Sequence, residues 1–282
     1  MSRSQLCPIC GDQDSFDIDI LSRQFFGELT IMECKQCAHR FLLDAPTNEA
    51  LQTYYDGHYQ CDSRQQGLPR AGLRDRALAR SLLRVLPLNA HILEIGSNFG
   101  GMLMAMPKTY QLEGVELSAT AAAAAAREPR LTIYNGFFED IASKLPQSTY
   151  NCVIALAVIE HIRNPIDFLS RIASLLAPGG VAVIMTGDYA SWNACHLGAS
   201  WNLYHSDGHL HFFSDKSLSA ACSLVGLSVY AKVWAGPNPF TFRLPRLLGR
   251  ALHCQTTTLL LPFLFGHRPL GDLMYVWCRK PH

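Results

Sequence analysis

The fold is decided by the stretch Ile92-Leu93-Glu94-Ile95-Gly96-Ser97-Asn98-Phe99-Gly100-Gly101, an apolar strand followed by a loop that carries glycines. Gly96 and Gly100 let the backbone approach a ligand that a side chain would block. The loop lacks the full GxGxxG pattern of dinucleotide-binding proteins, and a single glycine loop is weak evidence when taken alone. It predicts a strand, a ligand-binding loop and a helix, in that order.

Short apolar segments alternate with helical segments from His91 onward. This alternation is typical of a parallel sheet with crossover helices. The expected strands are 91–97, 111–117, 131–134, 150–157, 181–186, 228–234 and 272–279, and the expected helices are 101–106, 118–128, 165–176 and 215–225. We therefore predict an α/β protein with a Rossmann-like, seven-stranded, mostly parallel sheet and flanking helices. Insertions at 187–214 and 236–271 interrupt the alternation, and long insertions of this kind often cover substrates. A packed helical hairpin explains the second insertion equally well.

Two acidic segments follow the second and third expected strands. Glu116 closes the second strand, 20 residues after Gly96, where a carboxylate can accept hydrogen bonds from both hydroxyls of a ribose. Gly136-Phe137-Phe138-Glu139-Asp140 follows the third strand and offers an apolar ring and a carboxylate to an adenine. Turn chemistry or surface charge would explain each segment alone. In this order they favour a nucleoside-containing cofactor, and the missing GxGxxG disfavours a nicotinamide-dependent oxidoreductase.

Paired cysteines mark residues 1–45. Cys7-Pro8-Ile9-Cys10 and Cys34-Lys35-Gln36-Cys37 are two CxxC turns with 23 residues between them. Two residues between thiolates let one tight turn point both sulfurs at the same ion, and two such turns complete a tetrahedral Zn²⁺ site. With four thiolates and no open position, Cys7, Cys10, Cys34 and Cys37 would form a structural site. His39 is a substitute ligand that four cysteines make unnecessary. A pair of disulfides is the alternative, and the five cysteines after Cys61 are interpreted as core residues.

The compartment and the broad class of partner follow from composition. The start of the chain, Met1 to Cys7, has no apolar stretch and predicts no signal peptide. The apolar run Leu259 to Phe265 has only seven residues, whereas a membrane-spanning helix needs about 20. We therefore expect a cytoplasmic protein with reduced thiols and no transmembrane segment. The net charge of +1 gives no general attraction to nucleic acid, and we expect no DNA partner. The segment 236–271 leaves peripheral membrane contact open.

Five motifs of the chain resemble, in order, those of class I S-adenosylmethionine-dependent methyltransferases. They are ILEIGSNFGG, GVELS, GFFED, YNCVIALAVIEHIRNP and LLAPGG, within roughly residues 75–235. The resemblance implies S-adenosylmethionine as the cofactor, with its methionine moiety at the glycine loop, its ribose on Glu116 and its adenine beside Phe138. The residues expected to bind it are Glu94, Gly96, Ser97, Asn98, Gly100, Glu116, Leu117, Phe138, Glu139, Ala155 and Leu156.

A narrower resemblance concerns the acceptor of the methyl group. The Glu-Ile-Gly-Ser-Asn loop, the two CxxC turns, the linker APTNEALQTYYDGHYQ and the downstream HLHFFS are similar to zinc-ribbon methyltransferases that act on nucleotide-linked sugars and related glycans. It implies a sugar, glycan or other small acceptor, nucleotide-linked or lipid-linked. It divides the chain into a zinc ribbon (1–45), a helical linker and lid (46–90) and a methyltransferase domain (91–282). The chain departs from those C-methyltransferases by ending after its seventh strand, which leaves O- and N-methylation open.

Histidines are the candidates for the general base, because an acceptor must lose a proton and histidine titrates near working pH. His161, with Glu160, comes just after the fourth strand, and His205, His209 and His211 lie in the insertion 187–214. His209 falls where the resembled sugar methyltransferases place their base, so we favour it over His161. Tyr55 and Tyr59 are similar to tyrosines that help to hold the sugar in those proteins, and Tyr59 joins the catalytic candidates.

Two other classes of function remain open at this point. One is a zinc-ribbon rRNA methyltransferase, whose N-terminal module would be basic because phosphate neutralisation dominates affinity. Residues 1–45 carry 4 basic and 7 acidic side chains, which disfavours RNA as a partner. The other is a non-catalytic fold that carries a zinc module for partner binding.

Overall fold

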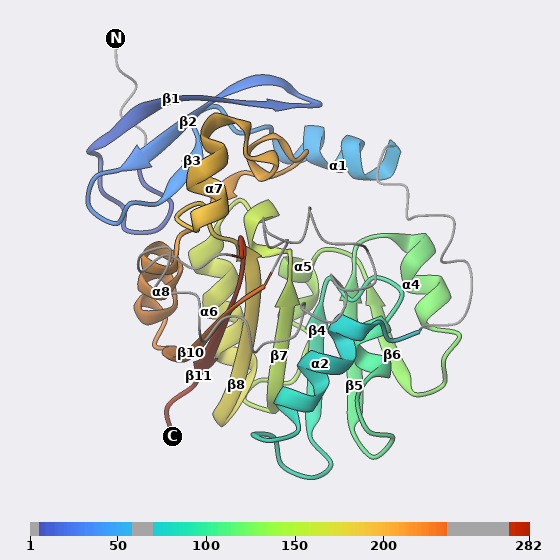
Figure 1. Ribbon diagram of the computed structural model, residues 1–282. Helices are drawn as coiled ribbons and strands as arrows, with labels where there is room; N and C mark the ends of the chain where they lie inside the picture. Colours follow the sequence, from blue (N-terminus) through green and yellow to red (C-terminus); the bar gives the residue numbers. More distant parts are fainter. Residues whose placement is uncertain (1–5, 58–69, 236–270) are drawn as a thin grey trace, which may run out of the picture.

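The computed structural model describes residues 6–57, 70–235 and 271–282. Two sheets organise these residues (Figure 1), a seven-stranded sheet in the methyltransferase-like region and a four-stranded sheet at the N-terminal end. The candidate Tyr59 and all but the last residue of the 236–271 insertion lie outside the described residues. Within the part of the chain that is described, no helix combines the length and apolarity needed to cross a membrane.

The larger sheet has the strand order β10-β11-β8-β7-β4-β5-β6. Its strands are β4 (His91–Ile95), β5 (Gln111–Glu116), β6 (Leu131–Asn135), β7 (Tyr150–Leu156), β8 (Leu176–Gly187), β10 (Ser228–Ala235) and β11 (Leu273–Arg279). The pairs among β4 to β8 are parallel, and β11 runs antiparallel to both of its neighbours. The predicted seven-stranded, mostly parallel sheet is confirmed. The strand order reverses between β4 and β7, which opens a crevice at their carboxyl ends.

Helices cover both faces of this sheet. They are α2 (Leu73–Leu82), α3 (Gly101–Met104), α4 (Ala119–Ala125), α5 (Phe138–Ala142), α6 (Pro165–Leu175) and α8 (Asp215–Leu224). The start of α6 illustrates the local causes. Asn164 accepts a hydrogen bond from the Asp167 N–H at 3.1 Å and Pro165 occupies the first turn, and both features favour a helix start.

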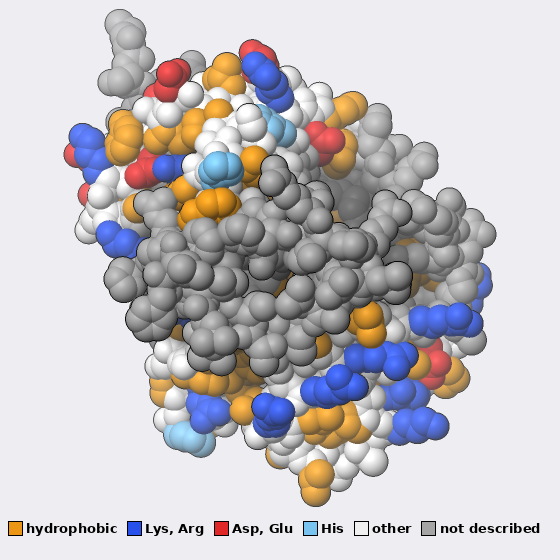
Figure 2. Space-filling view, in the orientation of Figure 1, with side chains coloured by type: hydrophobic (Ala, Val, Ile, Leu, Met, Phe, Trp, Pro, Cys, Tyr) orange, Lys and Arg blue, Asp and Glu red, His pale blue; other side chains and the backbone are white. Residues whose placement is uncertain are grey.

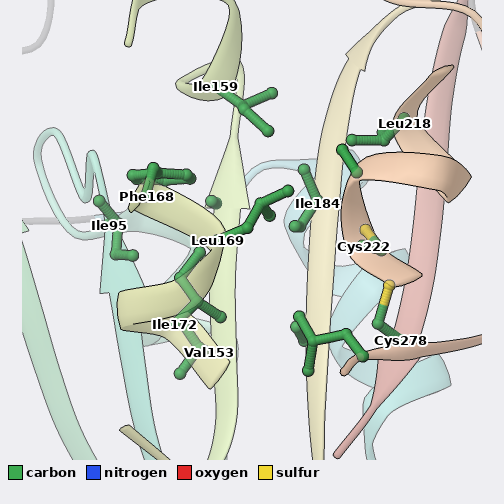
Figure 3. Close-up of a cluster of buried hydrophobic side chains, with 14 of the residues drawn as sticks. Ile95, Val153, Ile159, Phe168, Leu169, Ile172, Ile184, Leu218, Cys222 and Cys278 are labelled. Carbon is green, nitrogen blue, oxygen red and sulfur yellow. The ribbon is translucent and has the colours of Figure 1, made fainter. Parts of the chain in front are cut away.

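The strands of the sheet alternate their apolar side chains between two cores. In β7, Val153 and Ala155 belong to one core, whereas Cys152 and Ile154 belong to the other. Figure 3 shows Phe168, Leu169 and Ile172 of α6 and Leu218 and Cys222 of α8 directed at the first face, where Val153, Ile184 and Cys278 meet them. This period of two fixes the strand register, because a slip by one residue would exchange the two faces.

The N-terminal module shares its sheet with the insertion 187–214. The sheet order is β1 (Ser15–Gln24), β2 (Gly27–Cys34), β3 (Arg40–Leu42) and β9 (His211–Phe212). The insertion also holds α7 (Trp192–Leu197), η3 (Gly198–Ser200) and η4 (Asn202–His205), and α7 lies beside β3 in Figure 1. A common core joins the two parts through Ile31, Leu42, Trp201, Tyr204 and Phe212. The boundary expected at residue 45 remains a prediction, but the elements on its two sides fold together.

The expected helical linker contains α1 (Asn48–Gly57) and α2. The structure buries Leu78, Ala79 and Leu82, which lie on one side of the helix. Leu73 is 86% exposed and Leu83 is 43% exposed. Leu73 begins the helix and Leu83 follows its last residue, so neither contributes to the face that packs on the sheet.

Candidate active site

The loop after β4 has the backbone shape that its glycines predict. Gly96 and Gly100 have φ angles of +70° and +76°, a region that side chains disfavour. A Cβ on Gly96 would come within 2.7 Å of Cγ2 of Val158. The loop therefore lies directly against the segment that follows β7, so the two parts of the crevice are in contact.

Glu116 links the first two loops of the sheet. Its carboxylate is buried and accepts hydrogen bonds at 2.7 Å from the backbone N–H groups of Asn98 and Ser118, one on each oxygen. Burial raises the pKa of Glu116, and the backbone donors act against that rise. Each oxygen retains acceptor capacity, because a carboxylate oxygen accepts more than one hydrogen bond. This arrangement fits a carboxylate that receives two ribose hydroxyls.

Two buried polar atoms at the end of β4 and in the loop after it have no hydrogen-bond partner among the described residues. Among the described residues, Oε2 of Glu94 and Oγ of Ser97 are buried without a hydrogen bond. Burial, with the neighbouring charges of Asp75 and Glu116, raises the pKa of Glu94 well above its usual value. An unsatisfied buried polar group costs about 1–3 kcal/mol. Such groups fit a site completed by a polar ligand, and the amino-acid end of S-adenosylmethionine supplies the required donors and acceptors.

The two phenylalanines after β6 have different surroundings. Phe138 is 4% exposed and packs edge-to-face on Phe168, with ring centroids 5.3 Å apart. Phe137 is 40% exposed at the start of α5. The expected adenine contact of Phe138 stays a prediction, and the sequence analysis did not single out Phe137 as the exposed ring. Glu139 is half-buried, and burial raises its pKa.

The remaining cofactor candidates border the same crevice. Leu117 follows β5 and is half-buried, Ala155 is buried near the end of β7, and Leu156 ends that strand half-buried. Ala157 then adopts a positive φ of +56°. This sharp change of direction turns the chain after β7 into η2 (Ile159–His161).

The four N-terminal cysteines converge in the structure. Their sulfur atoms all lie within 4.8 Å of one another, with Cys7 and Cys37 at 3.5 Å and Cys10 and Cys34 also at 3.5 Å. The two turns match, since the N–H groups of Gly11 and Ala38 donate to the carbonyls of Cys7 and Cys34, both at 2.9 Å. Tetrahedral Zn–S bonds of about 2.3 Å need sulfurs roughly 3.8 Å apart. The cluster fits a zinc ion, and the cysteines are free thiols rather than disulfides.

A second convergence brings together Glu160, His161 and His209. One side-chain ligand atom from each lies within 4.8 Å of the others, and the two imidazole rings meet edge-to-face with centroids 4.7 Å apart. Nδ1 of His161 is 3.0 Å from the carbonyl oxygen of Gly208, and Nδ1 of His209 is 3.1 Å from that of Leu203. A carbonyl accepts only, so both Nδ1 atoms carry hydrogen in the neutral rings.

Burial sets the titration of this cluster. It lowers the pKa of His161 to about 4 and, with the neighbouring His161 charge, that of His209 to about 3. Burial also raises the pKa of Glu160 to about 7, against hydrogen bonds from its own backbone and from Thr186. At neutral pH both imidazoles are therefore uncharged, and the carboxyl group of Glu160 is close to half ionised. Oε2 of Glu160 is buried without a hydrogen bond among the described residues.

The other two histidine candidates lie apart from this cluster. His211 is buried in β9, with Nδ1 3.1 Å from Nε2 of His39, so both histidines join the N-terminal module to the insertion. His205 is hydrogen bonded to Ala199 and accepts from the Arg23 N–H at 3.2 Å. Tyr55 is on α1, and its side chain is not among those described.

Sequence reasoning missed several polar residues around the cluster. Thr186, one residue before the end of β8, is hydrogen bonded to Glu160, and Gln24 contacts the backbone of His209. No local sequence pattern marks Thr186 or Gln24, because each contacts residues that are distant along the chain. Asp272 is a further buried acid and accepts from the indole N–H of Trp201 at 3.0 Å. Trp201 thereby anchors the insertion to the start of β11.

The sheet order, with β11 antiparallel between β10 and β8, and the loop after β4 define a class I S-adenosylmethionine-dependent methyltransferase. The chain belongs to the family described as the methyltransferase domain, whose model matches residues 70–232. That match spans more than half of the 282 residues. The predicted enzyme class and cofactor-binding fold are confirmed. Among curated proteins, no sequence matches this chain.

Solved structures share this fold at low sequence identity. A chain of the complex between the Haloferax volcanii Trm112 methyltransferase activator and a methyltransferase is 17% identical, with a TM-score of 0.52 over 74% of this chain and 94% of that one. Phosphoethanolamine N-methyltransferase 2 of Haemonchus contortus, solved with S-adenosylmethionine, is 15% identical, with a TM-score of 0.52 over 86% of this chain and 62% of that one. An S-adenosylmethionine-dependent methyltransferase from Mesorhizobium loti is 16% identical, with a TM-score of 0.51 over 74% of this chain and all of that one.

Proposed function

We propose that this methyltransferase transfers a methyl group to a small polar acceptor, a sugar or glycan, bound at Glu160, His161 and His209. One observation carries the proposal. The cofactor loop touches the segment after β7 through Gly96 and Val158, two residues before Glu160. The three polar side chains thus gather at the edge of the sheet where the methyl donor belongs.

His209 is the general base in this proposal. Its Nδ1 donates to the Leu203 carbonyl, so the lone pair of the neutral ring is on Nε2. S-adenosylmethionine supplies the methyl group in a single displacement, and the fixed ring accepts the proton of the acceptor hydroxyl, amine or carbon. Burial lowers the pKa of His209 to about 3, so the ring is uncharged at neutral pH, and its strength as a base depends on the stabilisation that a neighbouring carboxylate supplies. Holding the reactants in line supplies much of the acceleration.

Glu160 complements His209 in the same step. A carboxylate within 4.8 Å of the imidazole stabilises the positive charge that appears when His209 accepts a proton. The pKa of about 7 places its ionisation in the working range of pH. His161 orients the pair through its ring contact with His209.

The surroundings of the cluster support a small acceptor. The hydroxyl group of Tyr54 on α1 is 3.4 Å from Oδ2 of Asp207, so the linker helix reaches the loop that carries His209. Figure 2 shows Lys and Arg side chains gathered low on the molecule, around α2, whereas both signs of charge mix over the N-terminal module. The exposed arginines of that helix and its ends are Arg70, Arg74, Arg76, Arg80 and Arg84. A basic zinc module for RNA is therefore not supported.

We further propose that Cys7, Cys10, Cys34 and Cys37 hold one structural Zn²⁺. The convergence of the four sulfurs supports this assignment. Zinc ligation requires thiolates, so the protein would work in a reducing compartment, in keeping with the expected cytoplasmic location.

The test is methyl transfer from radiolabelled S-adenosylmethionine to a panel of nucleoside-diphosphate sugars, lipid-linked glycans, small amines and ribosomal RNA. We expect transfer to a sugar-containing acceptor and its loss in His209→Ala. Transfer to RNA alone would overturn the sugar assignment. The assay is repeated with EDTA, because the same three side chains have a spacing that a divalent cation accepts. If EDTA abolished turnover while the structural zinc was retained, a metal ion at these three side chains would take the place of the general base in the mechanism.

A further inference from the structure

The tip of the β1–β2 hairpin is hydrogen bonded to the loop that carries His209. Gln24, the last residue of β1, is 9% exposed. Its side-chain Nε2 donates to the carbonyl oxygen of His209 at 2.8 Å, and its Oε1 accepts from the N–H of Gly208 at 3.1 Å. One amide side chain of the N-terminal module therefore binds the N–H of Gly208 and the carbonyl of His209, two neighbouring residues of the loop.

The orientation of this amide is determined by its partners. A backbone N–H can only donate and a carbonyl can only accept, so exchanging Oε1 and Nε2 of Gln24 would break both contacts. The second hydrogen on Nε2 is directed to Oγ of Ser22 at 2.8 Å. Oγ of Ser22 in turn donates to the carbonyl of Tyr204 at 2.5 Å. The amide group of Gln24 is thus fully hydrogen bonded in a buried position.

The Gly208–His209 segment sets the positions of both histidine rings. Gly208 provides the carbonyl that accepts from Nδ1 of His161, and His209 provides the second ring. A shift of this segment would move the His209 ring and release the His161 ring. Two neighbouring hydrogen bonds also hold this loop on the hairpin. The N–H of Arg23 donates to the His205 ring, and the N–H of Phe25 donates to the Asp207 carboxylate.

We propose that Gln24 is a positioning residue for the acceptor site, and that the N-terminal module completes this site through the hairpin tip. The proposal rests on the proposed function for the role of the histidines. In this proposal the N-terminal cysteine module positions the acceptor site, in addition to any contribution to the stability of the fold. The β1–β2 hairpin pairs from Ser15 opposite Cys34 to Gln24 opposite Gly27. A single hairpin therefore runs from the cysteine cluster to the histidine loop.

The decisive variant is Gln24→Glu, which keeps the size of the side chain and replaces its donor group by an acceptor. The matched control is Gln13→Glu, which makes the same change at an exposed position of the same module, outside both CxxC turns. Hydrogen–deuterium exchange is followed on peptides that cover residues 203–211, and the histidine tautomers are read by ¹⁵N NMR. S-adenosylhomocysteine affinity and zinc content are measured in parallel on each full-length protein.

The variant side chain would still accept from the Gly208 N–H, but its second oxygen would face the His209 carbonyl in place of the Nε2 donor. We therefore expect Gln24→Glu to exchange at least tenfold faster across residues 208–210 and to lose the single Nδ1–H tautomer of His161 and His209. Cofactor affinity and zinc content should equal those of the control. With the acceptor that the panel assay identifies, kcat should fall by about tenfold or more while the KM for S-adenosylmethionine stays constant.

Unchanged exchange and unchanged tautomers in Gln24→Glu would overturn the proposal. Loss of zinc in that variant would also overturn it, because Gln24 would then be a structural residue of the module. Both readouts are independent of turnover. A failure of the proposed acceptor chemistry, seen as an active His209→Ala enzyme, is therefore distinguishable from a failure of the positioning role.

Discussion

His161 and His209 lie 48 positions apart in the sequence, yet their imidazole rings meet edge-to-face with centroids 4.7 Å apart. Each ring is fixed by a hydrogen bond from Nδ1 to a backbone carbonyl of the segment 203–208. The contact places a residue that follows β7 against a residue of the insertion after β8. It is the basis for assigning the acceptor side of the crevice.

Replacing His209 by Ala should lower turnover by roughly 10²–10⁴-fold, the usual contribution of a general base. The affinity for S-adenosylhomocysteine should be unchanged, because the His209 ring is held by Leu203, His161 and Phe212 rather than by the loop after β4, among the residues that the structure describes. His196→Ala is the control, since His196 is an exposed histidine of the same insertion whose ring stacks on Trp192. Equal rates for His209→Ala and the native enzyme at saturating acceptor would remove His209 from the mechanism.

Glu160→Gln should separate stability from activity. The folded-state pKa of Glu160, about 7, lies above the ordinary glutamate value of 4.5, so the folded protein binds more protons than the unfolded chain between these pH values. Stability therefore falls as pH rises from about 4.5 to 7, by roughly 3 kcal/mol in total. The Gln variant should escape this loss and melt at a higher temperature than the native protein at pH 8.

The ionisation of Glu160 should raise turnover, although it lowers the stability of the fold. If the Glu160 carboxylate stabilises the protonated base, activity rises as pH increases through about 7. The rise should disappear in Glu160→Gln, and the residual rate should be low at every pH. Melting curves and rate profiles that match those of the native protein would contradict both parts of the prediction.

Glu116→Ala should weaken cofactor binding at least tenfold. A charge-assisted hydrogen bond to a hydroxyl contributes about 1.5–3 kcal/mol, and the carboxylate is placed to accept two. The variant also frees the N–H groups of Asn98 and Ser118, so the loop itself loses support. Calorimetry with S-adenosylhomocysteine measures the effect, with exposed Glu28→Ala as the control. An unchanged Kd would refute the ribose assignment.

Phe137 and Phe138 should respond differently to the same truncation. Phe138 is in the core against Phe168, so Phe138→Ala should cost about 3–5 kcal/mol of stability. Phe137 is 40% exposed, so Phe137→Ala should leave the melting temperature nearly unchanged and weaken S-adenosylhomocysteine binding if its ring covers the adenine. The reverse pattern in melting and binding would return the adenine contact to Phe138.

Local patterns predicted the sheet well, because periodicity and glycine loops are properties of short segments. The strand from Ile92, the loop at Gly96 and the carboxylate at Glu116 could all be placed from neighbours in the sequence. The acceptor side was predictable only as a choice among histidines. Selecting His161 and His209 required knowing that the insertion folds back onto η2, where the N–H of Leu210 donates to the carbonyl of Glu160 at 2.8 Å.

The contribution of the N-terminal module was not predictable from the sequence. Gln24 is an ordinary residue at the end of a strand until the hairpin is folded against residues 204–209. The pairing of β3 with β9 brings Phe41 opposite His211, although 170 positions separate them. No local spacing encodes such a contact, since it depends on packing between two parts that are each too small to form a core alone.

The cysteine cluster gives the last prediction. Purified without chelators, the protein should contain one zinc ion per chain by elemental analysis, because four sulfurs within 4.8 Å satisfy a tetrahedral site. Cys34→Ser should lose the metal and much of the order of β1–β3, since in so small a module the binding energy is folding energy. The same variant should raise hydrogen exchange at residues 203–211, because the hairpin that ends at Gln24 begins opposite Cys34. Cys195→Ser, at an exposed cysteine outside the cluster, should retain zinc and native exchange. Metal-free native protein, or a metal-free Cys34→Ser variant with an unchanged exchange pattern, would show that the module is held together without zinc.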